Sequence, residues 1–436
     1  VNPLLDYAIV KEKTKEYVLA KELVKKYFPK VKKFKTIKGK ELVHLKYQPL
    51  FDYFSNLDNA FKVVAASFVS TEEGTGIVHI APAFGEDDYN LCKVNNIVFV
   101  QPVDIEGKFT SEVKDFQGKF VKDADPEIIN HLKHKSLLFK TEKFTHSYPF
   151  CWRCNTPLLY YAMKSWFVRV TKVKDKLIEY NKKINWFPEH IKEGRYGKFL
   201  ESLRDWALSR SRFWGTPLPI WRCTCGNETI IGSIQELRKK GKNVKKDIDL
   251  HRPIIDEVQI QCEKCNSLMS RVPDVIDAWY DSGSAAFAQF HYPFENKELF
   301  EKRFPYDFIA EALDQTRGWF YTLHVLAILL FDNIAYKNVV CAGFIVDENN
   351  EKMSKSKGNI IMPDEMFDKV GVDSVRLQMC YSDLADNKRF SVNVVNESVL
   401  PFLNILWNCY LFTKELGKSY SKDIKLGLED KWIISR

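Results

Sequence analysis

The sequence NNEKMSKSKGN, at residues 349–359, follows an apolar run, NVVCAGFIV at residues 338–346. The apolar run is rich in β-branched residues and predicts a buried strand that ends in a polar turn. Ligands of open α/β sheets bind beyond the carboxyl ends of the strands, so a loop here can bring Lys352, Lys355 and Lys357 to a polyphosphate. The pattern is compatible with a site that positions phosphate and neutralises its charge, but three lysines alone fit an ordinary lysine-rich surface turn better.

The length and composition limit the class of protein. A chain of 436 residues predicts roughly two to four domains. No apolar run reaches the roughly 18 residues of a spanning helix, so we expect a soluble protein without a membrane partner. The net charge of +8 suits a polyanionic partner such as tRNA, but many unrelated proteins share it. Six of the ten cysteines fall in close pairs, which favours a reducing, cytoplasmic location over a disulfide scaffold.

Two of the close cysteine pairs predict a metal site. Cys223 and Cys225 precede a basic, polar stretch, and Cys262 and Cys265 follow it. Two such pairs can surround one Zn²⁺ tetrahedrally, and a short insertion with little apolar sequence needs a metal in order to fold. A third pair, Cys151 and Cys154, fits a structural or redox pair as well as half of a zinc site.

A glycine-rich stretch lies in the first part of the chain, where residues 1–150 contain many short β-like runs and predict a β-rich module. The stretch, GTGIVHIAPAFGEDDY at residues 74–89, includes His79, Asp87 and Asp88. A histidine and two acids in such a loop could orient a water molecule or hold an amine. They could equally form a turn and cap a helix, and both interpretations stay open.

A second group of polar residues stands at a predicted strand-to-helix junction. Residues 275–284 predict a strand that runs into a loop, and residues 308–331 predict a strand followed by an apolar helix. Glu311, Asp314 and Gln315 at the junction could hold an amino group and ribose hydroxyls, or could cap the helix. Residues 201–212 show helical periodicity, and their arginines could face phosphate or solvent.

Four strings in this sequence resemble signature sequences of class I aminoacyl-tRNA synthetases, in the family's order. They are GTGIVHIAPAFGEDD at residues 74–88, RDWALSRSRFWGTPLP at 204–219, DQTRGWF at 314–320 and KMSKSKGN at 352–359. The resemblance covers essentially the whole chain. The string DQTRGWF favours the isoleucyl group of this family, and the valyl group is the alternative.

The resemblance implies an α/β protein with an incomplete Rossmann-type catalytic core. It further implies a β-rich editing insertion, a small zinc-binding insertion and the start of an anticodon-binding helical bundle. The implied boundaries are an editing domain at 1–150, a return into the core at 151–221, a zinc-binding insertion at 222–270, the core with its KMSKS loop at 271–358, a stem-contact region at 359–395 and the helical domain at 396–436.

The resemblance also assigns roles to single residues. It implies catalysis by Lys352 and Lys355, and ATP binding by Lys352, Ser354 and Lys355. It also implies an isoleucine pocket lined by Trp279, with contacts to isoleucyl-adenylate from Glu311, Asp314 and Gln315. Editing is assigned to His79 and Asp88, and metal binding to Cys223, Cys225, Cys262 and Cys265. The chain departs from the family pattern at Ala312, where glycine is common. An added methyl group there could tighten the pocket.

The implied reaction joins L-isoleucine to tRNA(Ile) at the expense of ATP, with ATP, Zn²⁺ and Mg²⁺ as cofactors and a monomer as the expected state. Hydrolytic editing of valyl-tRNA(Ile) has a physical motive, because one missing methylene is worth only about 1–3 kcal/mol in an apolar pocket; the isoleucyl enzyme is the standard example of this limit. Two further interpretations compete with this one. Residues 1–150 could form a trans-editing hydrolase, or the chain could be a non-catalytic zinc-containing tRNA-binding module.

Two family features have no match in the sequence, namely a His-x-Gly-His string and a threonine-rich editing peptide. The chain also begins at Val1 and stops inside a predicted helix at residues 429–436. We therefore expect a fragment of a longer protein, in which a missing targeting signal has no meaning. We expect this fragment alone not to activate isoleucine, and its editing activity is in doubt.

Overall fold

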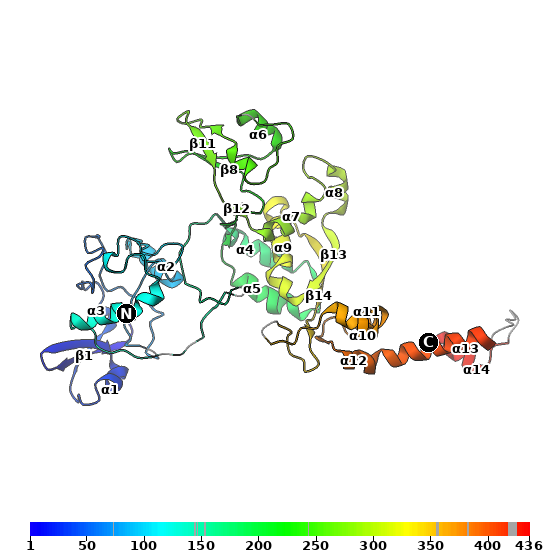
Figure 1. The fold of residues 1–436 in the computed structure, drawn as a ribbon, viewed down its shortest axis with the longest axis horizontal. Helices are drawn as coiled ribbons and strands as arrows, with labels where there is room; N and C mark the ends of the chain where they lie inside the picture. The colour runs from blue at the N-terminus through cyan, green and yellow to red at the C-terminus, as the bar shows by residue number, and fades with distance from the viewer. Residues whose placement is uncertain are drawn as a thin grey trace. The chain divides into compact units, whose positions relative to one another are not determined.

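The chain divides between Lys164 and Ser165 into two units in a computed structural model (Figure 1). The boundary lies beyond residue 150 because the next residues are tied to the first unit. The amide of Ala162 donates to the carbonyl of Ala83 at 2.9 Å. The hydroxyl of Tyr161 donates to the carbonyl of Val103, also at 2.9 Å. The structure describes residues 1–72, 74–143, 145, 147–151, 154–242, 244–354, 357–381, 383–416 and 425–436.

The first unit contains one antiparallel sheet with strand order β2-β1-β3. Its described strands and α-helices are β1 (Asp6–Glu12), β2 (Lys15–Ala20), β3 (Lys35–Lys38), α1 (Val24–Tyr27), α2 (Glu86–Val94) and α3 (Val121–His134). Tyr7 stands opposite both Ala20 and Ile37, and the alternation along β1 buries Ala8 and Val10 against α1. Most of the described residues between β3 and Lys164 form turns and irregular segments around α2 and α3.

The second unit is built on a parallel sheet with strand order β13-β14-β5. Its strands are β13 (Tyr306–Ala312), β14 (Tyr336–Ala342) and β5 (Asn185–Phe187). Helix α9 (Trp319–Phe331) connects β13 to β14, which confirms the predicted strand and apolar helix. Every residue of α9 from Phe320 to Ile328 is buried, as an almost wholly apolar helix requires.

Several helices accompany this sheet. They are α4 (Lys174–Asn181), the π-helix η5 (Lys192–Gly197) with α5 (Lys198–Glu201), α7 (Ala278–Ala288) and α8 (Lys297–Arg303). Helix α7 lies so close to α9 that a Cβ at Gly283 would stand 2.9 Å from Cβ of Thr322. The prediction of a loop after residue 276 is therefore wrong, because this contact with α9 holds the segment as a helix.

Two further predictions of local structure are corrected. Residues 201–212 are not helical, since α5 ends at Glu201 and the short strands β6 (Trp206–Ala207) and β7 (Ser209–Arg210) follow. These strands pair with β4 (Phe167–Val168) and β12 (Val275–Ile276), so long-range pairing overrides helical periodicity.

The strand predicted at 338–346 is broken at Gly343. After β14, strand β15 (Ile345–Val346) pairs with β16 (Lys388–Arg389) instead of with the main sheet. A Cβ at Gly343 would lie 2.2 Å from the carbonyl oxygen of Asp386, so only glycine allows the two backbones to approach here.

A small antiparallel sheet forms the segment that we call the cysteine insertion, residues 220–271. Its strand order is β10-β11-β8-β9. Its elements are β8 (Ile220–Arg222), β9 (Glu228–Ile230), α6 (Ile234–Lys240), β10 (Ile260–Gln261) and β11 (Leu268–Arg271). The Ser233 hydroxyl caps α6 by accepting from the amide of Glu236 at 3.1 Å.

The last part of the chain is helical. Its helices are α10 (Pro363–Val370), α11 (Val372–Tyr381), α12 (Val392–Ser398), α13 (Leu400–Leu416) and α14 (Leu428–Ser435). Pro363 opens α10, a position that suits its fixed φ and its missing N–H. The aromatic-rich sequence at residues 399–410 also suggests a buried helix, but only Val399 is buried. Helix α13 exposes Trp407 at 60%, and none of residues 400–415 is buried. None of the described helices has the length and apolar character needed to cross a membrane.

Candidate functional site

The lysine-rich loop at residues 347–359, which we call the lysine hairpin, is described except for residues 355 and 356. Its two ends are tied together by polar side chains. Asp347 Oδ1 accepts from the amides of Asn349 at 3.0 Å and Glu351 at 2.8 Å, while its Oδ2 accepts from Nδ2 of Asn359 at 2.8 Å. Asn359 Oδ1 in turn accepts from the amide of Ser354 at 2.9 Å. The hydrogen bond from Asn359, followed by that from the Glu351 amide, lowers the pKa of Asp347. One carboxylate and one amide thus define where the hairpin starts and ends.

The described lysines of this hairpin differ in their surroundings. Lys357 Nζ lies 2.9 Å from Glu351 Oε2, so its charge is already compensated. Lys352 Nζ lies 5.4 Å from the centre of the Phe344 ring, and no described carboxylate lies within ion-pair distance of it. Its charge is available to a phosphate. Lys355, to which the sequence assigns catalysis and ATP binding, lies outside the described residues, as does Ser356.

The other predicted contacts to substrate gather where η7 (Leu313–Arg317) links β13 to α9. Glu311 is exposed at the carboxyl end of β13, and Asp314 Oδ2 accepts from Nε2 of Gln315 at 2.9 Å. Gln315 Oε1 also accepts from the amide of Trp319 at 2.9 Å, so this residue, rather than Asp314, caps the start of α9. The capping interpretation thus holds for Gln315, while contact of these residues with a substrate stays a prediction.

Trp279 reaches this junction from α7. Trp279 is 42% exposed. If Gly318 carried a Cβ, that atom would lie 2.9 Å from Cη2 of the Trp279 indole and 2.7 Å from Oε1 of Gln315. The structure therefore brings Trp279 and Gln315 together on either side of a glycine backbone. Because β13 and β14 are parallel, with Ala312 opposite Ala342, this junction and the lysine hairpin both follow the carboxyl ends of neighbouring strands.

Cys341, opposite Glu311 in the sheet, plays no nucleophilic part at this edge. Burial above all raises the pKa of the Cys341 thiol to about 11; the nearby Arg195 opposes that rise and Asp314 adds to it. A thiol that stays protonated at neutral pH is a poor nucleophile. The candidates for chemistry at this edge of the sheet are therefore its charged and hydrogen-bonding side chains, among them Lys352, Glu311 and Asp314.

The four predicted metal ligands meet in the cysteine insertion. The Sγ atoms of Cys223, Cys225, Cys262 and Cys265 all lie within 4.8 Å of one another. Cys223 and Cys262 are buried and the other two are exposed. The hydroxyl and then the amide of Ser267 lower the pKa of Cys265 to about 6, so one thiolate forms readily. Four sulfur atoms around one point suit a tetrahedral, thiolate-binding ion.

The third cysteine pair lies in the first unit. Cys154 Sγ lies 3.1 Å from Oγ1 of Thr156, and hydrogen bonds from this residue, first from its side chain and then from its backbone, lower the pKa of Cys154 to about 7. Cys151 is half-buried and Cys154 is exposed. Trp152 and Arg153 lie outside the described residues. The choice between a redox pair and half of a zinc site stays a prediction.

The two candidate editing residues lie on either side of the start of α2. Asp88, in the first turn, accepts from the amide of Ala81 at 3.0 Å and so holds the loop before the helix. A Cβ at Gly85 would lie 3.1 Å from Cγ of Asp88, which keeps the turn tight. His79 is exposed. Asp88 therefore has at least a structural role, and a role in binding stays a prediction.

Sequence patterns missed three groups that shape these sites. Asp347 belongs to none of the quoted strings, although an aspartate before a turn of two asparagines is a known signal for side-chain hydrogen bonds to the following amides. Gly318 lies within a quoted string, but its contact with Trp279 joins distant segments. The pair of Arg210 and Asp277, 2.8 Å apart, likewise joins residues 67 positions apart. No local pattern predicts either of the last two.

Comparison with known proteins gives a consistent result. The family model "tRNA synthetases class I (I, L, M and V)" matches residues 12–391. Isoleucine–tRNA ligase of Clostridium kluyveri is 48% identical over 445 aligned residues, covering 100% of this chain and 43% of that protein. The same ligase of Clostridium tetani is 47% identical with the same coverage. The chain thus spans less than half the length of these relatives.

Proposed function

The chain belongs to the class I tRNA synthetases of the isoleucine, leucine, methionine and valine group, and from that premise we propose that it is part of an isoleucine–tRNA ligase. The whole protein would activate L-isoleucine with ATP, transfer it to tRNA(Ile) and hydrolyse mischarged valyl-tRNA(Ile). Identity of 48% to an isoleucine–tRNA ligase over the entire chain supports this choice over a valine enzyme. We further propose a monomer that works in the cytoplasm.

In this proposal the lysine hairpin acts on ATP. Lys352, with no described carboxylate partner, stabilises negative charge that develops on the phosphates as the bond to pyrophosphate breaks, and Lys355 and Ser354 assist it. Asp347 and Asn359 hold the hairpin in a closed shape. Mg²⁺, when bound to the phosphates, supplies further neutralisation.

The junction at Gly318 would receive the amino acid and its adenylate. Trp279 offers an apolar face to the isoleucine side chain, while Glu311 and Asp314 attract its ammonium group and the ribose hydroxyls. Gln315 is less free, because its oxygen accepts from the Trp319 amide and its nitrogen donates to Asp314. It can bind a ligand only through the remaining N–H or lone pair.

Two further sites complete the proposal. The four cysteines of the insertion bind Zn²⁺ as a structural ion, because closed four-sulfur sites leave no position for substrate. His79 and Asp88 serve the editing reaction, in which the Asp88 carboxylate would attract the ammonium group of a mischarged amino acid.

The observation that carries the proposal is the placement of an available lysine and a tryptophan-lined junction after neighbouring parallel strands in a chain of this family. The test is isoleucine-dependent exchange between ATP and pyrophosphate by the whole protein. Lys352→Ala should lower kcat about 100-fold, since lost electrostatic stabilisation of a transition state costs that much. Lys337→Ala, which removes an exposed lysine of β14 paired with Asp307, is the control.

Exchange that depends on valine and not on isoleucine would replace the proposal with a valine enzyme. Salt-dependent tRNA binding without any exchange would favour the non-catalytic zinc module. The 436-residue chain by itself should give no exchange, because its sequence contains no His-x-Gly-His string; robust exchange would contradict this part.

A further inference from the structure

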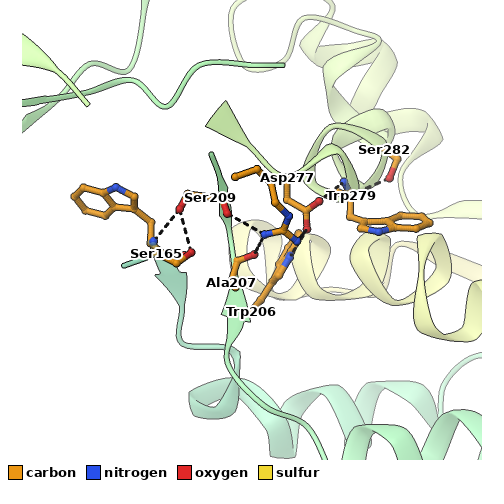
Figure 2. A network of polar contacts seen from close by, with 9 residues as sticks. Ser165, Trp206, Ala207, Ser209, Asp277, Trp279 and Ser282 are labelled. Atoms are coloured by element: carbon orange, nitrogen blue, oxygen red, sulfur yellow. Dashed lines mark hydrogen bonds and ion pairs between the residues drawn. The ribbon is translucent and has the colours of Figure 1, made fainter. Parts of the chain in front are cut away.

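Asp277 is a buried carboxylate at the start of α7, and all of its polar atoms are used (Figure 2). It is only 4% exposed. Its Oδ1 accepts from the amide of Trp279 at 3.3 Å, which caps the helix. Its Oδ2 accepts from the indole nitrogen of Trp206 at 3.0 Å and from Nη2 of Arg210 at 2.8 Å. Such a carboxylate is well satisfied, and removing it leaves its donors without partners.

The donors to Asp277 come from strands that are themselves anchored. The other guanidinium nitrogen of Arg210 donates to the carbonyls of Ala207 at 2.7 Å and Ser209 at 2.9 Å. The Ser209 hydroxyl lies 3.0 Å from that of Ser165 and accepts from the amide of Trp166 at 3.0 Å. Figure 2 shows this network continuing from Ser165 to the first turn of α7. Asp277 is therefore held from a fixed framework.

Residues other than Asp277 also restrict the position of Trp279. The indole meets the backbone of Gly318, and the Trp279 carbonyl accepts from the Ser282 hydroxyl at 3.1 Å. Trp319, the first residue of α9, donates from its indole nitrogen to the carbonyl of Ser282 at 3.0 Å. The position of the Trp279 ring thus depends on the Asp277 cap of α7 and on the contact between the indole and Gly318.

We propose that Asp277, held by Arg210 and Trp206, is a positioning residue that fixes the first turn of α7 and so keeps the Trp279 indole against Gly318. By doing so it determines how well the pocket separates isoleucine from valine. The inference rests on the proposed function, in which Trp279 lines that pocket. Discrimination of one methylene needs close contact with a rigid wall, and an uncapped helix start does not provide one.

The test compares three variants of the whole protein in the exchange assay. Asp277→Ala removes the cap and the ion pair. Asp277→Asn keeps a capping oxygen but loses the charge that attracts Arg210. Asp332→Asn, at an exposed ion pair beyond the far end of α9, is the matched control. The isoleucine-to-valine ratio of kcat/KM should fall about tenfold in Asp277→Ala and less in Asp277→Asn, while KM for ATP changes less than about twofold.

A readout without catalysis keeps the inference separate from the proposed function. In protein labelled with 5-fluorotryptophan, the ¹⁹F resonance of Trp279 is assigned by its loss in Trp279→Phe. It should shift or broaden in both Asp277 variants and stay in place in Asp332→Asn. An unchanged resonance together with an unchanged isoleucine-to-valine ratio would overturn the inference. Equal losses of kcat/KM for isoleucine and for ATP would also overturn it. If the wild-type protein activates no isoleucine, the proposed function fails, and the resonance alone decides the positioning role.

Discussion

The cysteine insertion and the parallel-sheet core belong to the same unit, yet they are stabilised in different ways. Among the described residues the core of the insertion contains 9 buried residues, and two of these are the proposed metal ligands Cys223 and Cys262. The core around the parallel sheet contains 20, drawn from strands and helices on either side of the insertion in sequence. A core this small needs an additional stabilising interaction such as a bound metal. In a large core the stability comes from many separate contacts.

This difference shows that two parts of one unit can depend on different kinds of interaction for their stability. We expect the insertion to rely on a few strong interactions, namely the binding of a metal by the four cysteines and an ion pair whose arginine, Arg271, is buried. The sheet core relies on many weak apolar contacts around α9, although a few polar side chains such as His324 are buried within it. Changes to single residues should therefore affect the insertion abruptly and the sheet core gradually.

Removal of the metal should give the largest effect. We expect Cys225→Ser to abolish tight zinc binding by the purified chain and to unfold the insertion, since structural zinc contributes on the order of 10 kcal/mol. Zinc content and hydrogen exchange of the β8 and β11 amides measure this. Cys380→Ser, at an exposed cysteine outside the cluster, is the control. Equal loss of protection in α9 would contradict the independence of the two cores.

Breaking the buried ion pair of the insertion comes next. The Arg271 side chain is fully buried, and its Nε donates to Asp256 Oδ1 at 2.7 Å. Asp256→Ala leaves this guanidinium without a counter-charge and should cost about 3 kcal/mol in the unfolding free energy of the insertion. Glu228→Ala, which removes an exposed partner of Arg222, should cost less than about 1 kcal/mol. Similar losses in the two variants would show that burial of the pair is unimportant.

A histidine in the sheet core should make that core sensitive to pH. Burial lowers the pKa of His324 to about 4, although the hydrogen bond to the Leu177 carbonyl opposes the shift. In the unfolded chain the imidazole binds a proton near pH 6.5, so the core is most stable above that pH and loses stability as the pH falls toward 4.

Unfolding in urea at pH 7 and pH 5 measures this dependence. The loss of unfolding free energy between the two pH values should be about 2 kcal/mol smaller in His324→Gln than in the wild type. His190→Gln, at an exposed histidine of the same unit, should behave like the wild type. A pH dependence unaffected by His324→Gln would assign the sensitivity to other groups.

The smallest effect should come from the lysine hairpin, which neither core holds. Asp347→Ala removes three hydrogen bonds at the surface and should raise KM for ATP in the whole protein about threefold to tenfold, with little change in KM for isoleucine. Asp307→Ala, at the exposed pair with Lys337, is the control. A larger rise in KM for isoleucine than for ATP would separate the hairpin from ATP.

The sequence predicted those features whose partners lie close together along the chain. The paired cysteines have the right spacing, and the apolar run after β13 forms the helix α9. It failed where distant partners decide the local structure. The segment after Asp277 became a helix because Gly283 packs against Thr322, and the arginine-rich segment at 204–212 became strands because it pairs with β4 and β12.

The same limit applies to the candidate site. The residue types of the site could be named from the strings that contain them, but not the groups that hold them in place. Arg210 and Asp277 are 67 positions apart in the sequence, and Trp279 and Gly318 are separated by 39. Only the folded chain places these partners together.

The contact between Trp279 and Gly318 has a consequence for redesign of the pocket. The indole lies against the Gly318 backbone, so its position is set by where two helices begin and not by a neighbouring rotamer. Exchanging side chains that do not hold the start of α7 or α9 would alter the surroundings of the ring and leave the ring in place. An engineer who wants a wider or narrower opening would have to move the start of α7 or α9.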